Sequence, residues 1–461
     1  MKFAFQRILD EALHDNFNLS SKNVLRECLA SVRATFEGLI LKWWFPTPPH
    51  PRDFLMMASS DMVRGPRVLY SFAHKLGAGR ICWTAWQQVL GLHAAGAEVT
   101  AMVGCTVRRP PDGVRLKTTL GVGRLRIPYR LLGIRRASMI HDYLTARWLA
   151  ANWREVDIVH TWPLGALQTI QTARRHGIPV VFERQNCHTA YAYRVVEEEC
   201  RSLGVVLPDG YEHTYDAMNL KHELKEFDAA DFLLCPSDFV KKTFIDEGFH
   251  TAKLLRHQYG YDSTRISPGT QSPLDGKPLI MLYAGLCSPR KGLHHALRAW
   301  LNSEASKTGR FLVCGEFAAS YRKYLEDMLS QPGVEVLGHR SDLPDLMKQA
   351  DLFVLPTVEE GSALVTYEAR GAGCVLLVSD AAGAMCEHLK DALVHPSGDM
   401  AELAKHIDTL NRDRHLLARL RQNSIETLDD LSWEAAGKRL ATVYKQAISS
   451  YFTTPPRPNE H

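Results

Sequence analysis

The chain has 461 residues, of which 45% are hydrophobic and 23% charged, and this ordinary globular composition excludes collagen-like, coiled-coil and fully disordered proteins. At roughly 150 residues per domain, the length predicts two or three domains. Lys and Arg number 55 against 51 Asp and Glu, so the net charge of +4 is too small for a protein dedicated to binding nucleic acid. We therefore expect no nucleic-acid partner.

The cysteines and the first residues indicate the cellular compartment. None of the ten cysteines belongs to a Cys-x-x-Cys pair, and several stand inside apolar runs, which is typical of buried free thiols in a reducing environment. Charges interrupt the first 13 positions, so no signal peptide is expected, and no uncharged apolar run approaches the roughly 20 residues of a membrane-spanning helix. These features predict a cytoplasmic protein, at most peripheral on the inner face of a membrane.

Residues 1–65 form a separate N-terminal segment with the pattern of an amphipathic helix. Apolar residues between Val24 and Ile40 recur at helical spacing, and Trp43 and Trp44 follow them. A helix that ends in aromatic residues can lie at a membrane interface, and it can equally pack on the first domain. Both interpretations predict a helical extension.

From residue 66 onward, short apolar runs alternate with helical patterns, which predicts βαβ units and an α/β fold. The runs are nearly continuous, as in strands that are buried on both faces of a parallel sheet. They lie at residues 68–72, 98–103, 157–161, 179–183, 231–236, 279–285, 310–315, 334–338, 351–356 and 374–379.

A stretch with three prolines and two glycines, residues 263–278, interrupts this alternation and predicts a linker. We therefore expect two Rossmann-like, doubly wound domains, residues 66–262 and 263–432. They should face a central cleft in which ligands bind at the carboxyl ends of the strands. Residues 451–461 are polar and contain proline, and we expect a disordered tail.

The strongest functional signal, residues 356–373, follows an apolar run and therefore marks the carboxyl end of a strand. Glu360 and Glu368 are eight positions apart, about two helical turns, and would face the same side of a helix. Residues between them that can approach a ligand through their backbone are Gly361, Ser362, Ala363 and Leu364. Because two acids repel phosphate, we expect them to hold sugar hydroxyls; the alternative is a helix with two solvated glutamates.

The second signal lies in residues 282–300, where a strand ends at Gly285 and a loop carries Arg290 and Lys291 before the next helix. Adjacent Arg and Lys at such a turn can neutralise a diphosphate, and Arg can contact it through two nitrogens. Alone, the pair could equally be solvated. Both signals, however, fall in the same half of the chain at equivalent strand ends.

Three other segments carry weaker signals. The loop of residues 71–80 contains Gly77 and Gly79, which permit close backbone approach, but its spacing is not that of the dinucleotide-binding fingerprint. Residues 108–136 hold nine basic residues against one acid, which predicts either a solvated basic face or contact with an anionic membrane surface. The histidines do not have the spacing of metal ligands, and the pattern around the pair at 294–295 predicts a helix. We therefore expect no metal site.

These motifs resemble the retaining glycosyltransferases of family 4, which have the GT-B fold. The resemblance covers about residues 66–446 and implies that a final helix, residues 433–450, completes the N-terminal domain. The segments that carry it are LYAGLCSPRKG (282–292), the Glu360-x7-Glu368 block, HPSGD (395–399) and LSWEAAGKRLATVY (431–444), with DIVHTWP, RRHGIPVVF, AADFLLCPSDFVKKTF and YGYD upstream in the family's order.

The resemblance implies that a sugar moves from a nucleoside-diphosphate sugar to a hydroxyl of a glycan, a lipid-linked sugar or a small molecule. It implies retention of the anomeric configuration, with no metal or other cofactor. By the same resemblance, Arg290 and Lys291 bind the donor diphosphate, Glu360 contacts the transferred sugar and Glu368 holds the ribose. The glycines on the donor side are Gly77, Gly79 and Gly285.

The chain departs from the family pattern in two places. Leu286 stands where many members have Arg, so Arg290 is expected to supply that charge. The family's Thr-x-His after the fourth strand is FERQNCHT here, which puts Gln185 at the position of the His and leaves the acceptor side open. The candidates for the acceptor side are His160, Glu183, Arg184, Asn186 and His188.

Three rival functions are compatible with parts of this pattern. A sugar-nucleotide epimerase of the same fold would cleave the same bond without an acceptor. A catalytically silent sugar-nucleotide-binding protein would keep the site without turnover. An NAD-dependent oxidoreductase is disfavoured because the dinucleotide fingerprint is absent.

Overall fold

The computed structural model describes residues 65–122, 125–126, 133–211, 213–270 and 276–453. The predicted helical extension lies outside the described residues except for Gly65, and so do parts of the basic segment and of the linker. Among the helices that the structure describes, none is both long and apolar enough to cross a bilayer.

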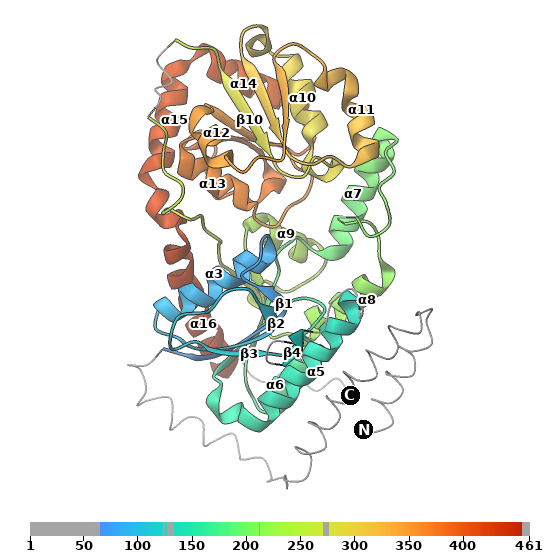
Figure 1. The fold of residues 1–461 in the computed structure, drawn as a ribbon, viewed down its shortest axis with the longest axis vertical. Coiled ribbons are helices and arrows are strands. Elements are labelled where there is room, and N and C mark those ends of the chain that lie inside the picture. The colour runs from blue at the N-terminus through green and yellow to red at the C-terminus, as the bar shows by residue number, and fades with distance from the viewer. Residues whose placement is uncertain (1–64, 123–124, 127–132, 212, 271–275, 454–461) are drawn as a thin grey trace. The chain divides into compact units, whose positions relative to one another are not determined.

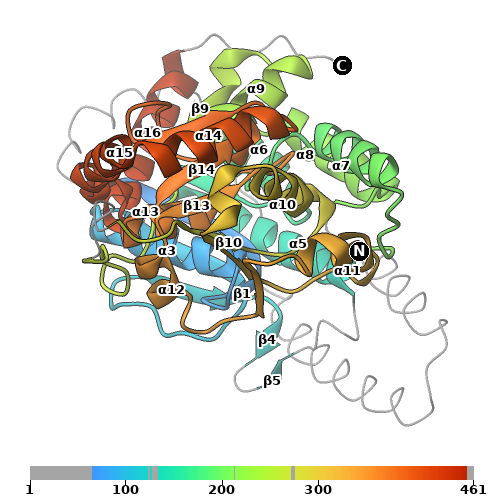
Figure 2. The same ribbon diagram turned by 90° about the horizontal axis from the view of Figure 1, so that it is seen from above.

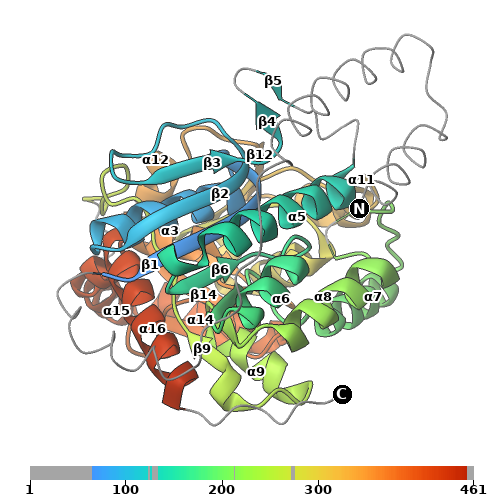
Figure 3. The same cartoon turned by 90° about the horizontal axis from the view of Figure 1, so that it is seen from below.

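Seven parallel strands form the first sheet, in the order β3-β2-β1-β6-β7-β8-β9. Figure 1 labels β1, β2 and β3 of this sheet, and Figure 3 also labels β6 and β9. They are β1 Arg67–Leu76, β2 Glu98–Thr106, β3 Arg115–Thr118, β6 Ile158–Thr161, β7 Val180–Glu183, β8 Phe232–Cys235 and β9 Leu254–Arg256. A separate antiparallel ribbon joins β4 Gly121–Val122 to β5 Leu125–Arg126. The strand order reverses between the neighbours β1 and β6, and such a switch point opens a crevice at the carboxyl ends of the strands.

Helices cover both faces of this sheet. They are α3 Ile81–Ala94, α5 Ile134–Asn152, α6 Leu167–Arg175, α7 Thr189–Leu203, α8 Ala217–Ala229 and α9 Asp238–Asp246. Successive side chains of β1 point to opposite faces of the sheet. Tyr70 and Phe72 pack in one core with α3, whereas Leu69 packs in another core with Leu149 of α5. Burial on both faces explains why the apolar runs are continuous.

The second sheet has six parallel strands in the order β12-β11-β10-β13-β14-β15. The strands are β10 Ile280–Ala284, β11 Arg310–Cys314, β12 Val334–Gly338, β13 Leu352–Leu355, β14 Val375–Ser379 and β15 Ala392–His395. The helices are α10 Leu293–Leu301, α11 Ala319–Leu329, α12 Leu343–Gln349, α13 Leu364–Ala372, α14 Met400–Arg412 and α15 Arg414–Glu426. Figure 2 shows helices packed around these strands, and the switch point lies between β10 and β13.

These two parallel sheets with helices on their faces confirm the predicted α/β fold with two Rossmann-like halves. Nine cysteines lie in the described part of the chain; none of these nine forms a disulfide, and six are buried.

Helix α16, Trp433–Thr453, returns from the second sheet to the first. It starts beside the linker, where the backbone N–H of Trp433 donates to the carbonyl of Tyr261 at 3.2 Å, and it then packs along α3. The helix continues past residue 450 into the segment predicted to be a disordered tail. The reason is that Tyr451 still packs against the core of the first sheet.

The contact between α3 and α16 depends on two glycines. A Cβ atom on Gly437 would lie 2.4 Å from the Cα of Gly91, so neither position has room for a side chain. Gly437→Val should therefore push the helices apart and lower the free energy of unfolding by about 1–3 kcal/mol, the usual cost of overpacking. Urea denaturation measures this effect. Thr442→Val, on the exposed side of the same helix, is the matched control. Equal stability of the two variants would contradict the packing.

Candidate functional site

The site is built from the two loops that follow β10 and β13, on either side of the switch point. The hydroxyl of Thr357 and the backbone N–H of Val358 both donate to the carbonyl of Arg290, at 2.8 and 2.9 Å. Gly292 has a left-handed backbone, and a Cβ atom there would lie 2.0 Å from the carbonyl oxygen of Pro356. The glycine of the Arg-Lys-Gly motif is therefore required for the two loops to touch.

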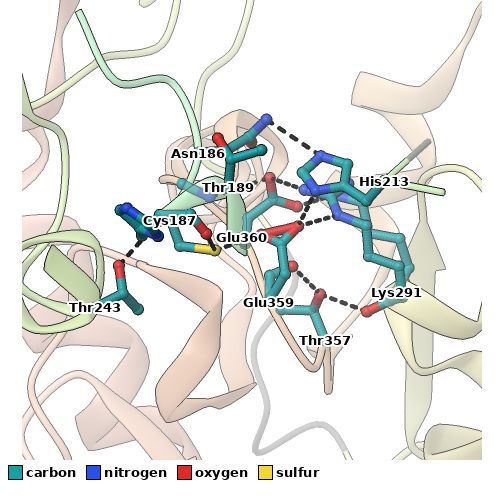
Figure 4. Close-up of polar contacts among 12 residues, drawn as sticks. Asn186, Cys187, Thr189, His213, Thr243, Lys291, Thr357, Glu359 and Glu360 are labelled. Atoms are coloured by element: carbon teal, nitrogen blue, oxygen red, sulfur yellow. Dashed lines mark hydrogen bonds and ion pairs between the residues drawn. The ribbon is translucent and has the colours of Figure 1, made fainter. Parts of the chain in front are cut away.

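Four charged side chains meet where these loops touch (Figure 4). The guanidinium of Arg290 donates to Glu359 through Nε at 2.5 Å and to Glu360 through a terminal nitrogen at 2.9 Å. Lys291 pairs with the other carboxylate oxygen of Glu360. Arg290 and Glu360 are buried, and Glu359 is fully buried. The predicted diphosphate-binding cations are thus paired with two carboxylates.

The ionisation of Glu359 follows from its neighbours. Burial alone would raise the pKa of its carboxyl, but Arg290 and His213 hold the pKa down at about 2. Sequence reasoning singled out Glu360 and missed Glu359, although the Glu-Glu pair was a signal for it. The Glu359 carboxyl is therefore ionised at neutral pH, beside the guanidinium of Arg290.

The first sheet's domain contributes three side chains to this cluster. The thiol of Cys187 donates to Glu359 at 3.1 Å, and His213 places Nδ1 at 3.0 Å from the same carboxylate. Asn186 donates through Nδ2 to His213 Nε2 at 3.3 Å (Figure 4). His213 has a left-handed backbone with φ of 57°, a conformation that costs energy for a residue other than glycine. His213 could not be predicted from the sequence, because it lies in a loop that has no periodic hydrophobic pattern.

The loops of the two domains touch beside this cluster. A Cβ atom on Gly361 would lie 1.7 Å from the carbonyl oxygen of Gln185, and the hydroxyl of Ser237 donates to the carbonyl of Gly361 at 2.5 Å. Gln185 thus approaches the second domain through its backbone. Small residues in the segment 361–363 are what permit this contact.

Helix α13 begins directly after this contact. Its N-cap residue is Ala363, and no side chain caps the helix. The hydroxyl of Ser362 is used elsewhere, donating to the carbonyl of Gly383 at 2.9 Å. An uncapped helix N-terminus favours an anion, which agrees with the predicted phosphate site.

Glu368, about one turn into α13, lines a cavity of about 210 Å³ instead of joining the charged cluster. Residues from both domains and from the linker enclose it: Trp83, Gly260, Asp262, Arg265, Ile266, Ser341, Leu343, Pro344, Met347, Leu364, Glu368 and Trp433. Burial raises the pKa of Glu368 to about 7, against the opposing effect of Arg265. The cavity therefore offers an aromatic face, an Arg and a carboxyl that titrates near neutral pH.

The two glycines of the loop at residues 71–80 are not among the residues that line this cavity. The carbonyl of Gly77 accepts a hydrogen bond from Arg108 Nε at 2.9 Å, and Trp83 follows in the first turn of α3. Gly79 has open space around its Cα. Gly285 directly follows β10, and its backbone N–H donates to the carbonyl of Cys314 at 3.0 Å.

Of the five predicted acceptor-side residues, Asn186 lies at the charged cluster, and the other four are buried inside the first domain. Glu183 binds the Tyr259 hydroxyl at 2.7 Å, and His160 binds the Tyr444 hydroxyl at 2.5 Å. The other two are also internal: Arg184 pairs with Glu223, and His188 packs among Phe227, Phe244 and Phe249. Their burial argues against direct contact with an acceptor.

Part of the chain matches a known family. Residues 270–427 match the glycosyl transferases group 1. An N,N'-diacetylbacillosaminyl-diphospho-undecaprenol alpha-1,3-N-acetylgalactosaminyltransferase of Campylobacter jejuni is 26% identical over 182 residues, which are 38% of this chain and 47% of that protein. A D-inositol 3-phosphate glycosyltransferase of Corynebacterium efficiens is 25% identical over 231 residues, 42% of this chain and 54% of that protein. The chain spans about half the length of these curated relatives.

Solved structures support the fold over most of the chain. Sucrose-phosphate synthase from Thermosynechococcus elongatus superposes with a TM-score of 0.62 and 18% identity, covering 84% of this chain and 100% of that one. HepE of Anabaena, solved with UDP-glucose, superposes with a TM-score of 0.56 and 15% identity, covering 83% of this chain and 100% of that one. The predicted GT-B fold is confirmed by these likenesses, while membership of family 4 stays a prediction.

Proposed function

We propose that this chain, which has the GT-B fold and matches the group 1 glycosyltransferases over residues 270–427, is a retaining glycosyltransferase that uses a nucleoside-diphosphate sugar. The observation that carries the proposal is the convergence of Arg290, Lys291 and the uncapped start of α13 at the switch point of the second sheet. Ligands of open parallel sheets bind at such a point.

The charge of the cluster selects the donor. Arg290 and Lys291 are held by Glu359 and Glu360, so a ligand must offer them comparable negative charge to displace these carboxylates. A diphosphate does so, and Arg and Lys then stabilise the charge that the leaving phosphate gains as the glycosidic bond breaks. These fixed cations supply the charge that the metal ion provides in metal-dependent transferases.

The cavity beside Glu368 suits the nucleoside of the same donor. Trp83 offers an aromatic face, and the Glu368 carboxylate can accept hydrogen bonds from ribose hydroxyls. Glu360 lies nearer the diphosphate-binding cations, where the transferred sugar would sit once Lys291 turns to phosphate. The resemblance to family 4 supports a reaction in which the acceptor hydroxyl attacks the sugar on the face from which the diphosphate departs. The leaving phosphate then helps to deprotonate that hydroxyl.

The acceptor side is formed by Asn186 and His213 in this proposal. His213 reaches the cluster from a loop that is distant in sequence from the family's usual histidine, and it bridges Asn186 to Glu359. The Campylobacter relative is named for transfer to a diphospho-undecaprenol-linked sugar, which supports a lipid-linked acceptor for this chain. A slow hydrolysis of the donor in the absence of acceptor would distinguish a transferase from a silent binding protein.

Removal of the cations tests the diphosphate assignment. Lys291→Ala should lower kcat/KM for the donor by roughly 100-fold or more, because a positive charge is lost where negative charge develops. Arg290→Lys should retain more activity than Arg290→Ala but stay below wild type, since the planar fork is lost. Nucleoside-diphosphate release from a panel of sugar nucleotides measures the rates, with Lys323→Ala on α11 as control. Near-wild-type turnover in Lys291→Ala would refute the assignment.

The two glutamates of the motif should have separable effects. Glu368→Gln should mainly raise donor KM, because the ribose is bound equally before and during reaction, whereas Glu360→Gln should mainly lower kcat. The pKa of Glu368 is about 7, and its ionised form accepts hydrogen bonds from the ribose hydroxyls. The donor KM should therefore decrease as the pH rises from about 6 to about 8. That dependence should disappear in Glu368→Gln. A pH-independent KM in the wild type, or exchanged effects of the two variants, would contradict these roles.

His213 should act on the acceptor rather than on the donor. His213→Ala and Asn186→Ala should slow transfer to a lipid-linked acceptor, while donor hydrolysis without acceptor and the donor KM remain close to wild type. His415→Ala, an exposed histidine on α15, is the control for general effects. A parallel loss of hydrolysis and transfer in His213→Ala would instead make it part of the donor site.

A further inference from the structure

Two neighbouring histidines of the second domain meet a glutamate of the first domain's helix α7. His294 Nε2 lies 2.7 Å from Oε1 of Glu199, and His295 Nε2 lies 2.8 Å from the same oxygen. The ligand-type atoms of the three residues all lie within 4.8 Å of one another. We propose that Glu199, His294 and His295 bind a divalent transition-metal ion, Zn²⁺ in the first place, between α7 and α10.

The three donors match the ligand chemistry of zinc. Imidazole nitrogens and a carboxylate oxygen bind Zn²⁺ at about 2.0–2.2 Å, usually in tetrahedral geometry with water as a fourth ligand when the protein offers three. Tetrahedral ligands at that length stand about 3.3 Å apart. The Glu199 side chain is 17% exposed, so it has room to move outward by that small amount and admit the ion.

The arrangement around His294 presents its Nε2 as a ligand. The ring's Nδ1 lies 2.7 Å from the hydroxyl of Tyr321, which also accepts the backbone N–H of His294 at 2.9 Å. Tyr321 is fully buried and holds the ring in place. A hydrogen bond at the far ring nitrogen is the usual way in which proteins orient a metal-binding histidine.

The contact between His294 Nε2 and Glu199 does not behave as an ordinary hydrogen bond. The distance is short and Nε2 is completely buried, yet the geometry is not that of an aligned hydrogen bond, whereas His295 Nε2 makes one with Glu199 at 2.8 Å. A buried nitrogen without an aligned partner is uncommon in proteins, and an ion held by both residues after a small outward movement of Glu199 would satisfy it.

Sequence spacing could not reveal this cluster, because Glu199 and His295 are 96 positions apart. Helix α7 joins the two halves of the molecule: Ala192 near its start packs in the core of the first domain, whereas Val205, just beyond its end, packs in the core of the second. An ion at this place would fasten α7 to the first turn of α10, directly after the loop that carries Arg290 and Lys291. The proposal rests on this geometry and does not require the proposed reaction.

Metal content tests the site directly. The full-length protein is stripped with EDTA, separated from the chelator, and titrated with Zn²⁺ against a chromophoric indicator, with bound metal counted by mass spectrometry. We expect one tightly held Zn²⁺ per chain and a higher Tm with the ion than without it. Co²⁺ in its place should give the strong visible absorption of a four-coordinate site. No stoichiometric binding of either ion would overturn the proposal and leave a hydrogen-bonded cluster.

Variants locate the ion within the chain. Glu199→Gln, His294→Ala and His295→Ala should each weaken Zn²⁺ binding by 100-fold or more, while Tyr321→Phe, which leaves the three ligands in place, should weaken it by roughly 10-fold to 100-fold. His222→Asn removes another histidine paired with a glutamate, Glu226, and should bind like wild type. If a ligand variant fails to fold, the Zn²⁺ affinity of Tyr321→Phe tests the site instead. Unchanged affinity in Tyr321→Phe and in the folded ligand variants would place the ion elsewhere and refute the site.

Discussion

The charge balance among Arg290, Lys291, Glu359 and Glu360 is the constraint on which the rest of the site depends. Arg290, Glu359 and Glu360 are buried, and a buried charge is tolerated only when an opposite charge and hydrogen bonds compensate it. Loss of one member would leave its partner uncompensated at a cost of about 3–5 kcal/mol. A ligand that draws the cations away must therefore bring its own negative charge, which is why we infer a diphosphate and not a neutral sugar alone.

The backbone is arranged to bring these charges together. The neighbouring strands β10 and β13 end at the same edge of the sheet, and Gly292 lets their loops touch. Because Gly361 has no side chain, the backbone of Gln185 in the first domain can lie against the loop that follows β13. Because His213 contacts Glu359 directly, we expect that release of Arg290 to a bound diphosphate also changes the surroundings of the acceptor-side pair. Donor binding and acceptor binding would thereby share one carboxylate.

The strands of both sheets could be predicted because burial on two faces produces continuous apolar runs. All ten predicted runs form strands, from β1 to β14. The sequence did not reveal β3, β9 and β15, which all lie at an edge of their sheet; β3 is mostly exposed, as Arg115 and Lys117 show, and β9 spans only three residues. Edge strands of this kind lack the signal that central strands carry.

Site residues that directly follow a strand could be predicted from the sequence, whereas side-chain contacts between loops far apart in the chain could not. Arg290, Lys291 and Glu360 were predicted from adjacent strand ends, and the structure brings them into one cluster. His160 and Glu183 also stand at strand ends, but the hydroxyls of Tyr444 and Tyr259 hold them inside the first domain. Burial of a polar side chain depends on partners far away in the chain, and one sequence does not show them.

A crystal structure with a bound nucleoside diphosphate is the most direct test of this account. The account predicts phosphate oxygens within hydrogen-bonding distance of Arg290 and Lys291, at the start of α13, with Lys291 released from Glu360. It also predicts the ribose against Glu368 in the cavity that Trp83 lines. A diphosphate bound elsewhere, with the four-charge cluster intact, would contradict the central claim.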